Sequence, residues 1–317
     1  MHSPTPAPPG SRRRVLWVPN TGARQMSRQS ISSACLRLAL PKGRMEQAVL
    51  TLLGDAGIRI RPSARGYRPE VSLPDTEAKT LKPQNIVEML SLGSRDLGFA
   101  GADWVAELEA NVVELLDTGL DPVQVVAAAP EELLENGRLP TRPIVVASEY
   151  ERLARRWIAA RGLSAEFVRS YGATEVFPPE DADVIVDNTA TGATLEANGL
   201  AVVDEVMRSS TRLYANPLAL ADPARRRRID DLVMLLNSVL VARRRVMLEV
   251  NASAECLDAV VAVLPSMRQA TVAPLFGNGG YAVKAAVPRD ALPQVIPAVK
   301  AAGGTDVVVS TLSQIVP

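Results

Sequence analysis

The feature that most constrains the fold of this 317-residue chain is a repeated alternation of short apolar segments with amphipathic helical segments. Residues 36–40 are expected to form a strand, and Met45, Val49 and Leu52 then recur at the spacing of one helix face. The same order returns in the strands predicted at 58–60, 97–100, 123–129, 144–148, 184–186 and 200–203, and in the helices predicted at 85–92, from 103, and at 149–161. This order predicts an α/β fold, with helices layered on mostly parallel strands.

The last quarter of the chain has a different order of elements. A long helix is predicted over 223–242, and we place a domain boundary near 243–245. The segments that follow are a strand at 246–250, a helix at 254–264, strands at 271–275 and 281–287, a helix at 290–302 and a strand at 306–310. This β-α-β-β-α-β order is that of the ferredoxin-like unit.

The charge and residue counts exclude several functions. Lys plus Arg and Asp plus Glu each number 35, which argues against a nucleic-acid binder, so the arginine runs 225–228 and 243–245 are interpreted as solvated helix faces. No apolar run reaches the roughly 18–20 residues of a membrane-spanning helix. The two cysteines, Cys35 and Cys256, fit a reducing cytoplasm. The single histidine, His2, excludes His-dependent triads and His-rich metal sites.

Residues 1–35 differ from the rest of the chain. They contain four prolines in the first ten positions and an arginine cluster at 12–14, and no acidic residue precedes Glu46. This composition predicts a disordered leader. Two interpretations stay open: an over-long gene start with Met26 as the true beginning, or an organelle transit peptide, which would place the protein in a plastid.

The segment after the predicted strand 184–186 has a phosphate-binding pattern. The strand ends at Asp187, a loop rich in Thr and Gly follows, and a helix is predicted from about Thr194. Backbone N–H groups at such a helix start attract anions, and Gly192 lets the backbone approach one closely. Asp187 suits ribose hydroxyls or Mg²⁺ better than phosphate itself. The alternative is a plain strand-loop-helix connection in which a Thr caps the helix.

Several separated segments resemble the ATP phosphoribosyltransferase family. They are Leu-Ala-Leu-Pro-Lys-Gly-Arg at 38–44, Asp-Leu-Gly-Phe-Ala-Gly-Ala-Asp at 96–103, Val-Ala-Ser-Glu-Tyr at 146–150 and Thr-Gly-Ala-Thr-Leu-Glu-Ala-Asn-Gly-Leu at 191–200. Residues 257–258, 264–265 and 270–275 resemble the regulatory domain of the long form of this enzyme. The resemblance covers residues 36–317, with the motifs in the family's order.

The resemblance implies a two-lobed, periplasmic-binding-protein-like catalytic region followed by a ferredoxin-like regulatory domain. The first lobe would span 36–122 and be completed by about 208–242, the second lobe would span 123–207, and the regulatory domain 243–317. The implied reaction transfers the phosphoribosyl group of phosphoribosyl pyrophosphate to N1 of ATP, and pyrophosphate leaves with Mg²⁺. This is the first step of histidine biosynthesis. Histidine would act as feedback inhibitor, and the chain would form homo-oligomers (dimer and hexamer) without a separate regulatory subunit.

The resemblance also implies roles for individual residues. Asp187 is the candidate for ribose or metal contact, and Lys42 and Arg44 are the candidates for a pyrophosphate clamp, although their turn could be an ordinary solvated loop. The expected substrate-binding residues are Asp183, Thr189, Ala190, Thr191, Gly192, Ala193, Thr194, Glu149, Tyr150 and Arg155. Thr271 is expected to bind the effector.

Structural explanations compete with several of these roles. Asp183 could be a solvent-facing residue at a strand start, Tyr150 an ordinary rim residue, Arg155 a solvated helix charge and Thr271 a plain strand residue. Asp103 is expected to cap its helix. Two other kinds of protein also stay open, a two-lobed solute-binding protein and a ligand-responsive regulatory protein, because fold alone does not decide function.

Overall fold

The computed structural model describes His2 and residues 35–62 and 66–316. The predictions for the leader and for a start at Met26 therefore lie outside the described residues. The strands are β1 (Leu36–Pro41), β2 (Ile60–Arg61), β3 (Glu70–Val71), β4 (Thr76–Leu81), β5 (Leu97–Gly101), β6 (Val113–Pro130), β7 (Ile144–Ser148), β8 (Ala165–Arg169), β9 (Val184–Thr189), β10 (Leu200–Ala215), β11 (Arg245–Ala252), β12 (Thr271–Pro274), β13 (Tyr281–Pro288) and β14 (Thr305–Thr311). The helices are α1 (Glu46–Asp55), α2 (Pro83–Ser91), α3 (Ala102–Leu108), α4 (Glu151–Arg161), α5 (Ala193–Ala197), α6 (Pro217–Ala221), α7 (Pro223–Arg243), α8 (Leu257–Ala262) and α9 (Leu292–Ala301).

The main sheet is mixed rather than parallel throughout. Its eight strands are ordered β4-β1-β5-β10-β6-β9-β7-β8. The neighbours are parallel at both ends of this order, as the β-α alternation predicts. In the middle, β10 runs antiparallel to both β5 and β6, and β6 runs antiparallel to β9. The sequence pattern did not indicate these antiparallel pairings.

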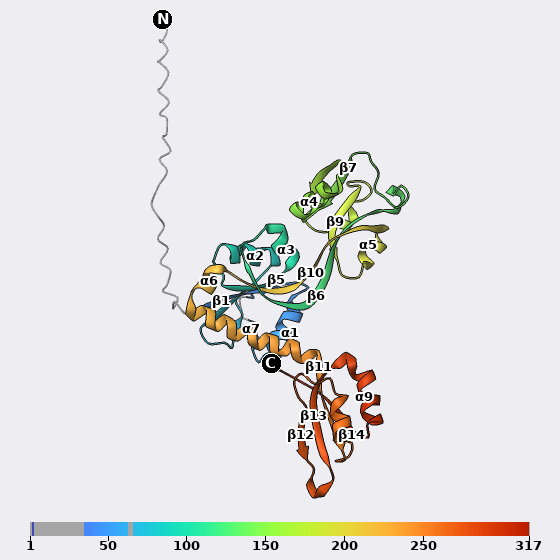
Figure 1. Ribbon diagram of the computed structural model, residues 1–317. Helices are drawn as coiled ribbons and strands as arrows, with labels where there is room; N and C mark the ends of the chain where they lie inside the picture. The colour runs from blue at the N-terminus through green and yellow to red at the C-terminus, as the bar shows by residue number, and fades with distance from the viewer. Residues whose placement is uncertain (1, 3–34, 63–65, 317) are drawn as a thin grey trace. The chain divides into compact units, whose positions relative to one another are not determined.

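Strands β6 and β10 are much longer than the apolar segments 123–129 and 200–203 that predicted them. They lie side by side from the pair Leu200–Pro130 to the pair Ala215–Val113, with several register shifts between (Figure 1). β10 pairs with β5 through residues 211–215, whereas β6 pairs with β9 through residues 124–128. The two long strands therefore connect a first lobe, built on β4, β1 and β5, with a second lobe, built on β9, β7 and β8.

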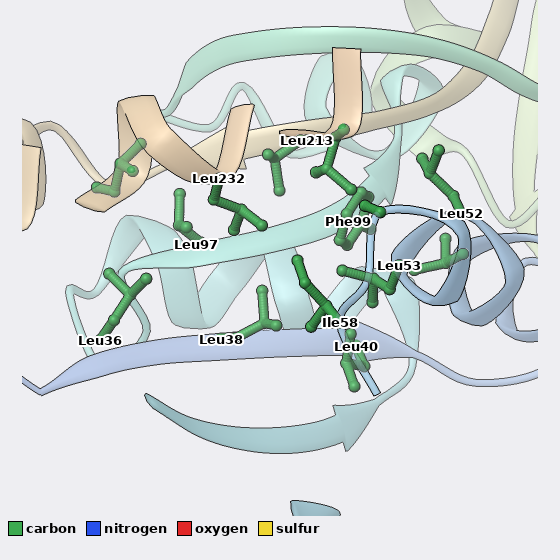
Figure 2. Packing of buried hydrophobic residues seen from close by; sticks show 14 of the residues in the cluster. Leu36, Leu38, Leu40, Leu52, Leu53, Ile58, Leu97, Phe99, Leu213 and Leu232 are labelled. Atoms are coloured by element: carbon green, nitrogen blue, oxygen red, sulfur yellow. The ribbon is translucent and has the colours of Figure 1, made fainter. Parts of the chain in front are cut away.

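The first lobe is held by side chains on both faces of its strands. Leu36, Leu38 and Leu40 alternate along β1 and pack with residues of α1 and α7, as Figure 2 shows. Ala39 points to the opposite face and packs with residues of α2. Full burial of a leucine contributes about 1.5–3 kcal/mol, so these rows are the main stabilising feature of the lobe.

The second lobe and the C-terminal segment have cores of their own. In the second lobe, Trp157 of α4 packs on one face of the sheet and Leu195 of α5 on the other. The C-terminal strands form a separate antiparallel sheet in the order β12-β13-β11-β14, with side chains of α8 and α9 in its core. This is the predicted ferredoxin-like unit, which is confirmed. No helix in the described part of the chain is long and apolar enough to span a membrane.

Candidate active site

A cavity of about 520 Å³ brings residues of both lobes together. The first lobe contributes Lys42, Arg44 and Lys82, and the second lobe contributes Glu149, Tyr150 and Asn188. The first-lobe residues follow the ends of β1 and β4, which are parallel strands whose carboxyl ends meet at one edge of the sheet. Ligands of open α/β sheets bind at that edge. We call this cavity the cleft.

Lys42 and Arg44 are available to an anion in the cleft. The backbone N–H of Lys42 donates to the Leu81 carbonyl at 3.0 Å, and Gly43 has φ +82°, which glycine adopts without strain. The Lys42 ammonium lies 5.6 Å from the centre of the Tyr67 ring. Within residues 35–62 and 66–316, no ion pair occupies either Lys42 or Arg44.

Tyr150 is buried beneath the cleft rather than free at its rim. Its hydroxyl donates to Asp103 Oδ2 at 2.7 Å and accepts from Asn188 Nδ2 at 3.0 Å. Its ring lies 4.7 Å from that of Trp104. Burial, followed by the charge of Asp103, raises the pKa of Tyr150 well above its ordinary value. The hydroxyl is therefore neutral at physiological pH and joins α3 of the first lobe to β9 of the second.

Asp103 does not cap α3, contrary to the sequence-based expectation. The residue before the helix is Gly101, and no side chain caps the helix start. Asp103 lies within the first turn, and its buried carboxylate accepts from Tyr150 and, at 2.7 Å, from Ser209 Oγ. Hydroxyl donors on neighbouring elements satisfy this carboxylate, and Ser209 Oγ in turn accepts the Asp103 N–H at 3.1 Å.

The loop after β9 has the form that the sequence predicts, and α5 begins at Ala193, one residue before the expected start. Gly192 has φ +82° and precedes α5. Thr189 Oγ1 accepts the Gly192 N–H at 2.8 Å, and Thr191 Oγ1 lies 3.4 Å from the Ala193 nitrogen. The hydroxyl oxygens of these two threonines thus accept backbone N–H groups of the loop, and each hydroxyl keeps its own hydrogen to donate. In the described residues, the backbone N–H groups of Thr191 and Thr194 have no hydrogen-bond partner.

Asp187 lies in an acidic environment, two residues before the end of β9. Burial raises its pKa to about 6, and the negative charges of Glu175 and Glu149 act in the same direction. The Asn188 N–H, 2.7 Å from Asp187 Oδ1, and the Thr174 hydroxyl lower the pKa and offset part of this shift. Such a carboxylate gains from a hydroxyl donor or a cation supplied by a ligand.

Other expected site residues lie away from this group. Asp183 is at the opposite end of β9, where it pairs with Arg142 at 2.7 Å and accepts the Val145 N–H at 2.8 Å. Arg155 is exposed on α4, bonded to Glu151 at 3.0 Å and stacked 4.9 Å from the Phe167 ring centre. The structure does not bring either residue to the cleft.

Thr271 begins β12 in the C-terminal sheet, where it is exposed. A cavity of about 690 Å³ at the junction of α7 and β11 is lined by none of the expected site residues.

The sequence interpretation did not select Lys82, Trp104 or Asn188, which line the cleft. The Lys-Pro pair at the start of α2 was an available signal for Lys82, because a helix start beside a strand end attracts anions.

The comparisons with known proteins agree with this arrangement. Residues 82–238 match the family described as ATP phosphoribosyltransferase, and residues 242–314 match the C-terminal domain of that family. The chain is 34% identical over 287 residues to the ATP phosphoribosyltransferases of Pelotomaculum thermopropionicum and Desulforudis audaxviator, covering 89% of this chain and 99% of each relative. A chain of the ATP phosphoribosyl transferase (HisG:HisZ) complex from Thermotoga maritima matches with a TM-score of 0.58 and 26% identity, over 65% of this chain and 98% of that chain.

These matches give the class of the protein, an enzyme that transfers a phosphoribosyl group. The chain belongs to the ATP phosphoribosyltransferase family. It therefore catalyses the first step of histidine biosynthesis, in which phosphoribosyl pyrophosphate and ATP give phosphoribosyl-ATP and pyrophosphate. Family membership excludes the solute-binding and regulatory-protein alternatives.

Proposed function

We propose that the cleft carries out this transfer with phosphoribosyl pyrophosphate held between the loop 189–194 and the pair Lys42 and Arg44. The observation that carries the proposal is the cavity itself, which places both cations together with Asn188, the residue between Asp187 and the loop. The N–H groups of Thr191 and Thr194 and the Thr194 hydroxyl would hold the 5-phosphate. Asp187 would accept hydroxyl donors from the ribose.

The chemistry places few demands on the protein. N1 of the adenine attacks C1 of the ribose, the bond from C1 to pyrophosphate breaks, and the ribosyl centre develops positive charge. Catalysis then depends on positioning the reactants and on stabilising the negative charge of the leaving group. Lys42 and Arg44 would supply that stabilisation. Glu149 and Tyr150, on the second-lobe side of the cleft, would position the adenine.

Mg²⁺ fits this site as an ion held mainly by the substrate. No group of three His, Cys, Asp or Glu side chains within the described ranges is placed to hold a metal. Mg²⁺ is commonly bound through one or two carboxylates together with substrate phosphates, and Asp187 is the carboxylate that we assign to it. When bound, the ion would neutralise charge on the pyrophosphate.

The test is the turnover of variants at Asp187 and in the loop, measured by the ultraviolet absorbance of the product. Asp187→Ala and Thr194→Ala are each expected to lower turnover roughly ten- to a hundred-fold, because a charge-assisted contact contributes about 1.5–3 kcal/mol. Asp181→Asn, an exposed substitution just before β9, is the control and should leave turnover unchanged. Normal kinetics in both variants would remove Asp187 and the loop from the site.

The C-terminal domain is proposed to regulate the enzyme. The support is the match of residues 242–314 to the family's C-terminal domain, together with a core separate from those of the two lobes. We propose that histidine binds this domain near Thr271, between neighbouring copies in a homo-oligomer of dimers and hexamers. On this proposal the chain needs no separate regulatory subunit.

A further inference from the structure

We propose that Glu107, a buried side chain of the first lobe, is a positioning residue for the adenine side of the cleft. It acts through Glu149 and Tyr150, which directly precede helix α4 of the second lobe, and it touches no substrate itself. The inference rests on the proposed function, because that function assigns the adenine to Glu149 and Tyr150.

Helix α4 receives its N-terminal cap from the other lobe. The first N–H groups of an α-helix have no partner within the helix. Among the residues that the structure describes, Tyr150 holds the N-cap position of α4, and its side chain makes no capping bond. Instead, the Glu107 carboxylate accepts the N–H of Arg152 at Oε1 and that of Leu153 at Oε2, both at 3.0 Å. Glu107 is only 3% exposed, so water is poorly placed to replace it.

The end of α3 is held by α4 in return. Helix α3 ends at Leu108, and the last carbonyls of a helix lack their usual partners within it. The Arg152 guanidinium donates to the Glu107 carbonyl at 3.1 Å, and the Arg156 guanidinium donates to the Ala106 carbonyl at 2.9 Å. Cations are favoured at helix C-termini and carboxylates at helix N-termini. The two helix ends, one from each lobe, therefore cap each other, and we call this contact the helix joint.

The helix joint lies beside the adenine side of the cleft. Asp103 and Glu107 are four residues apart on α3 and so lie on one face of it. Asp103 accepts the Tyr150 hydroxyl at 2.7 Å, while Glu107 holds the helix that follows Tyr150. Glu149 and Tyr150 both line the cleft. A shift of the start of α4 would therefore move both side chains relative to the cations of the first lobe.

Loop 189–194 is held on the other side of the second lobe. It follows β9, and Leu195 of α5 packs on the face of the sheet opposite to Trp157 of α4. Loss of the helix joint is therefore expected to misplace Glu149 and Tyr150 and to leave the loop in position. Since small misplacements of positioning groups are costly, the effect should fall on ATP rather than on phosphoribosyl pyrophosphate.

Steady-state kinetics of Glu107→Gln test the inference. The amide keeps the length of the side chain but accepts at only one of its two ends, so one capping bond is lost. We expect the KM for ATP to rise about tenfold and the KM for phosphoribosyl pyrophosphate to change less than about twofold. Asp222→Ala is the matched control, because it removes the cap of α7 and lowers stability away from the cleft. It should leave both KM values unchanged.

Arg156→Gln tests the same joint at an exposed position, where folding is not at risk. It removes the bond to the Ala106 carbonyl and should raise the KM for ATP by about two- to fivefold. Arg161→Gln is its control, because this guanidinium of the same helix bonds Asp204 of β10 instead of α3. It should change neither KM.

An unchanged KM for ATP in Glu107→Gln and Arg156→Gln, or equal rises in KM for both substrates, would overturn the inference. If Asp187→Ala still loses turnover in that case, the proposed function stands and Glu107 only stabilises the fold. A failure of the proposed function would appear separately, as normal turnover in both Asp187→Ala and Thr194→Ala.

Discussion

At the scale of single residues, the hydroxyl of Tyr150 has the most consequential position. It lies between a buried carboxylate of the first lobe, that of Asp103, and the amide of Asn188 in the second lobe. The local sequence places this tyrosine beside a predicted helix start but does not indicate which elements cover it. Its role in the cleft therefore includes holding the two lobes in register, in addition to any contact with adenine.

Tyr150→Phe should reduce the free energy of unfolding by about 1–3 kcal/mol, because the buried carboxylate of Asp103 loses a donor while the ring packing on Trp104 is kept. Urea unfolding followed by circular dichroism measures this change. Tyr171→Phe is the control, since Tyr171 is 89% exposed and its change should stay within about 0.5 kcal/mol. Equal losses of unfolding free energy in the two variants would contradict a stabilising hydrogen bond from the Tyr150 hydroxyl to Asp103.

Asp187 should make stability depend on pH. Its pKa is about 6 in the folded protein against an ordinary value of 3.8, so the folded protein binds more protons between these values. The contribution of this group to stability therefore falls as the pH rises from about 4 to about 6. Asp187→Asn should be more stable than the parent at pH 7, by about 1–2 kcal/mol after allowance for partial exposure.

Urea unfolding at pH 4.5, 5.5 and 7 tests this dependence, with the difference between Asp187→Asn and the parent expected to grow as the pH rises. Turnover of the parent should fall as the pH drops through about 6, because protonation removes the acceptor that the ribose or Mg²⁺ needs. A stability difference that is the same at every pH would show that the carboxyl is not perturbed.

At the scale of secondary-structure elements, helix α7 links the catalytic lobes to the C-terminal sheet. It extends over Pro223–Arg243, packs Ile229 and Leu236 into the first-lobe core, and leads within two residues to β11. The sequence predicted this helix over 223–242, and the structure extends it by one residue to Arg243. Its N-terminal cap is consequently a site where a local change should alter global stability.

Asp222→Ala should lower the free energy of unfolding by about 1 kcal/mol, because the Asp222 carboxylate accepts the N–H groups of Ala224 at 2.9 Å and Arg225 at 3.2 Å. Asp222→Asn keeps an acceptor in the same place and should lose much less. Thermal unfolding of both variants distinguishes the loss of the capping hydrogen bonds from the loss of the negative charge. If the Asn variant is destabilised as strongly as the Ala variant, the charge rather than the cap is the cause.

At the scale of the whole molecule, the chain has separate cores in two lobes and in the C-terminal domain. Regulation would require a ligand of the C-terminal domain to favour one arrangement of the molecule over another, with a coupling of about 1–3 kcal/mol. The C-terminal sheet offers an exposed edge for such a ligand, because every residue of β12 is exposed.

Thr271→Ala should raise the histidine concentration for half-inhibition by about tenfold and leave turnover without histidine unchanged. The reason is that a hydroxyl on β12 is proposed to bind the effector's polar groups. Thr311→Ala, an exposed threonine at the end of β14, is the matched control. Inhibition at the same histidine concentration in the Thr271 variant and the parent would place the effector elsewhere.

The sequence alone predicted the elements whose signals are local. The apolar periodicity of α1, the turn after β1, the strand-loop-helix around Gly192 and the C-terminal β-α-β-β-α-β order all follow from neighbouring residues. The extent of β10 did not follow, because Asp204, Glu205 and Arg208 interrupt its alternation and register shifts break its period. A strand of this kind is stabilised by its partner β6, which is distant in sequence.

The candidate site likewise has residues that the sequence predicted and residues that it did not. The motifs selected Lys42, Arg44, Asp187 and the loop because each belongs to a short local pattern, whereas Asp183, four residues before Asp187, points to the other end of the strand. Only the tertiary structure added Lys82, Trp104 and Asn188 to the cleft. Such groupings depend on sheet order and register, which are set by burial and pairing between distant segments rather than by the propensity of any one of them.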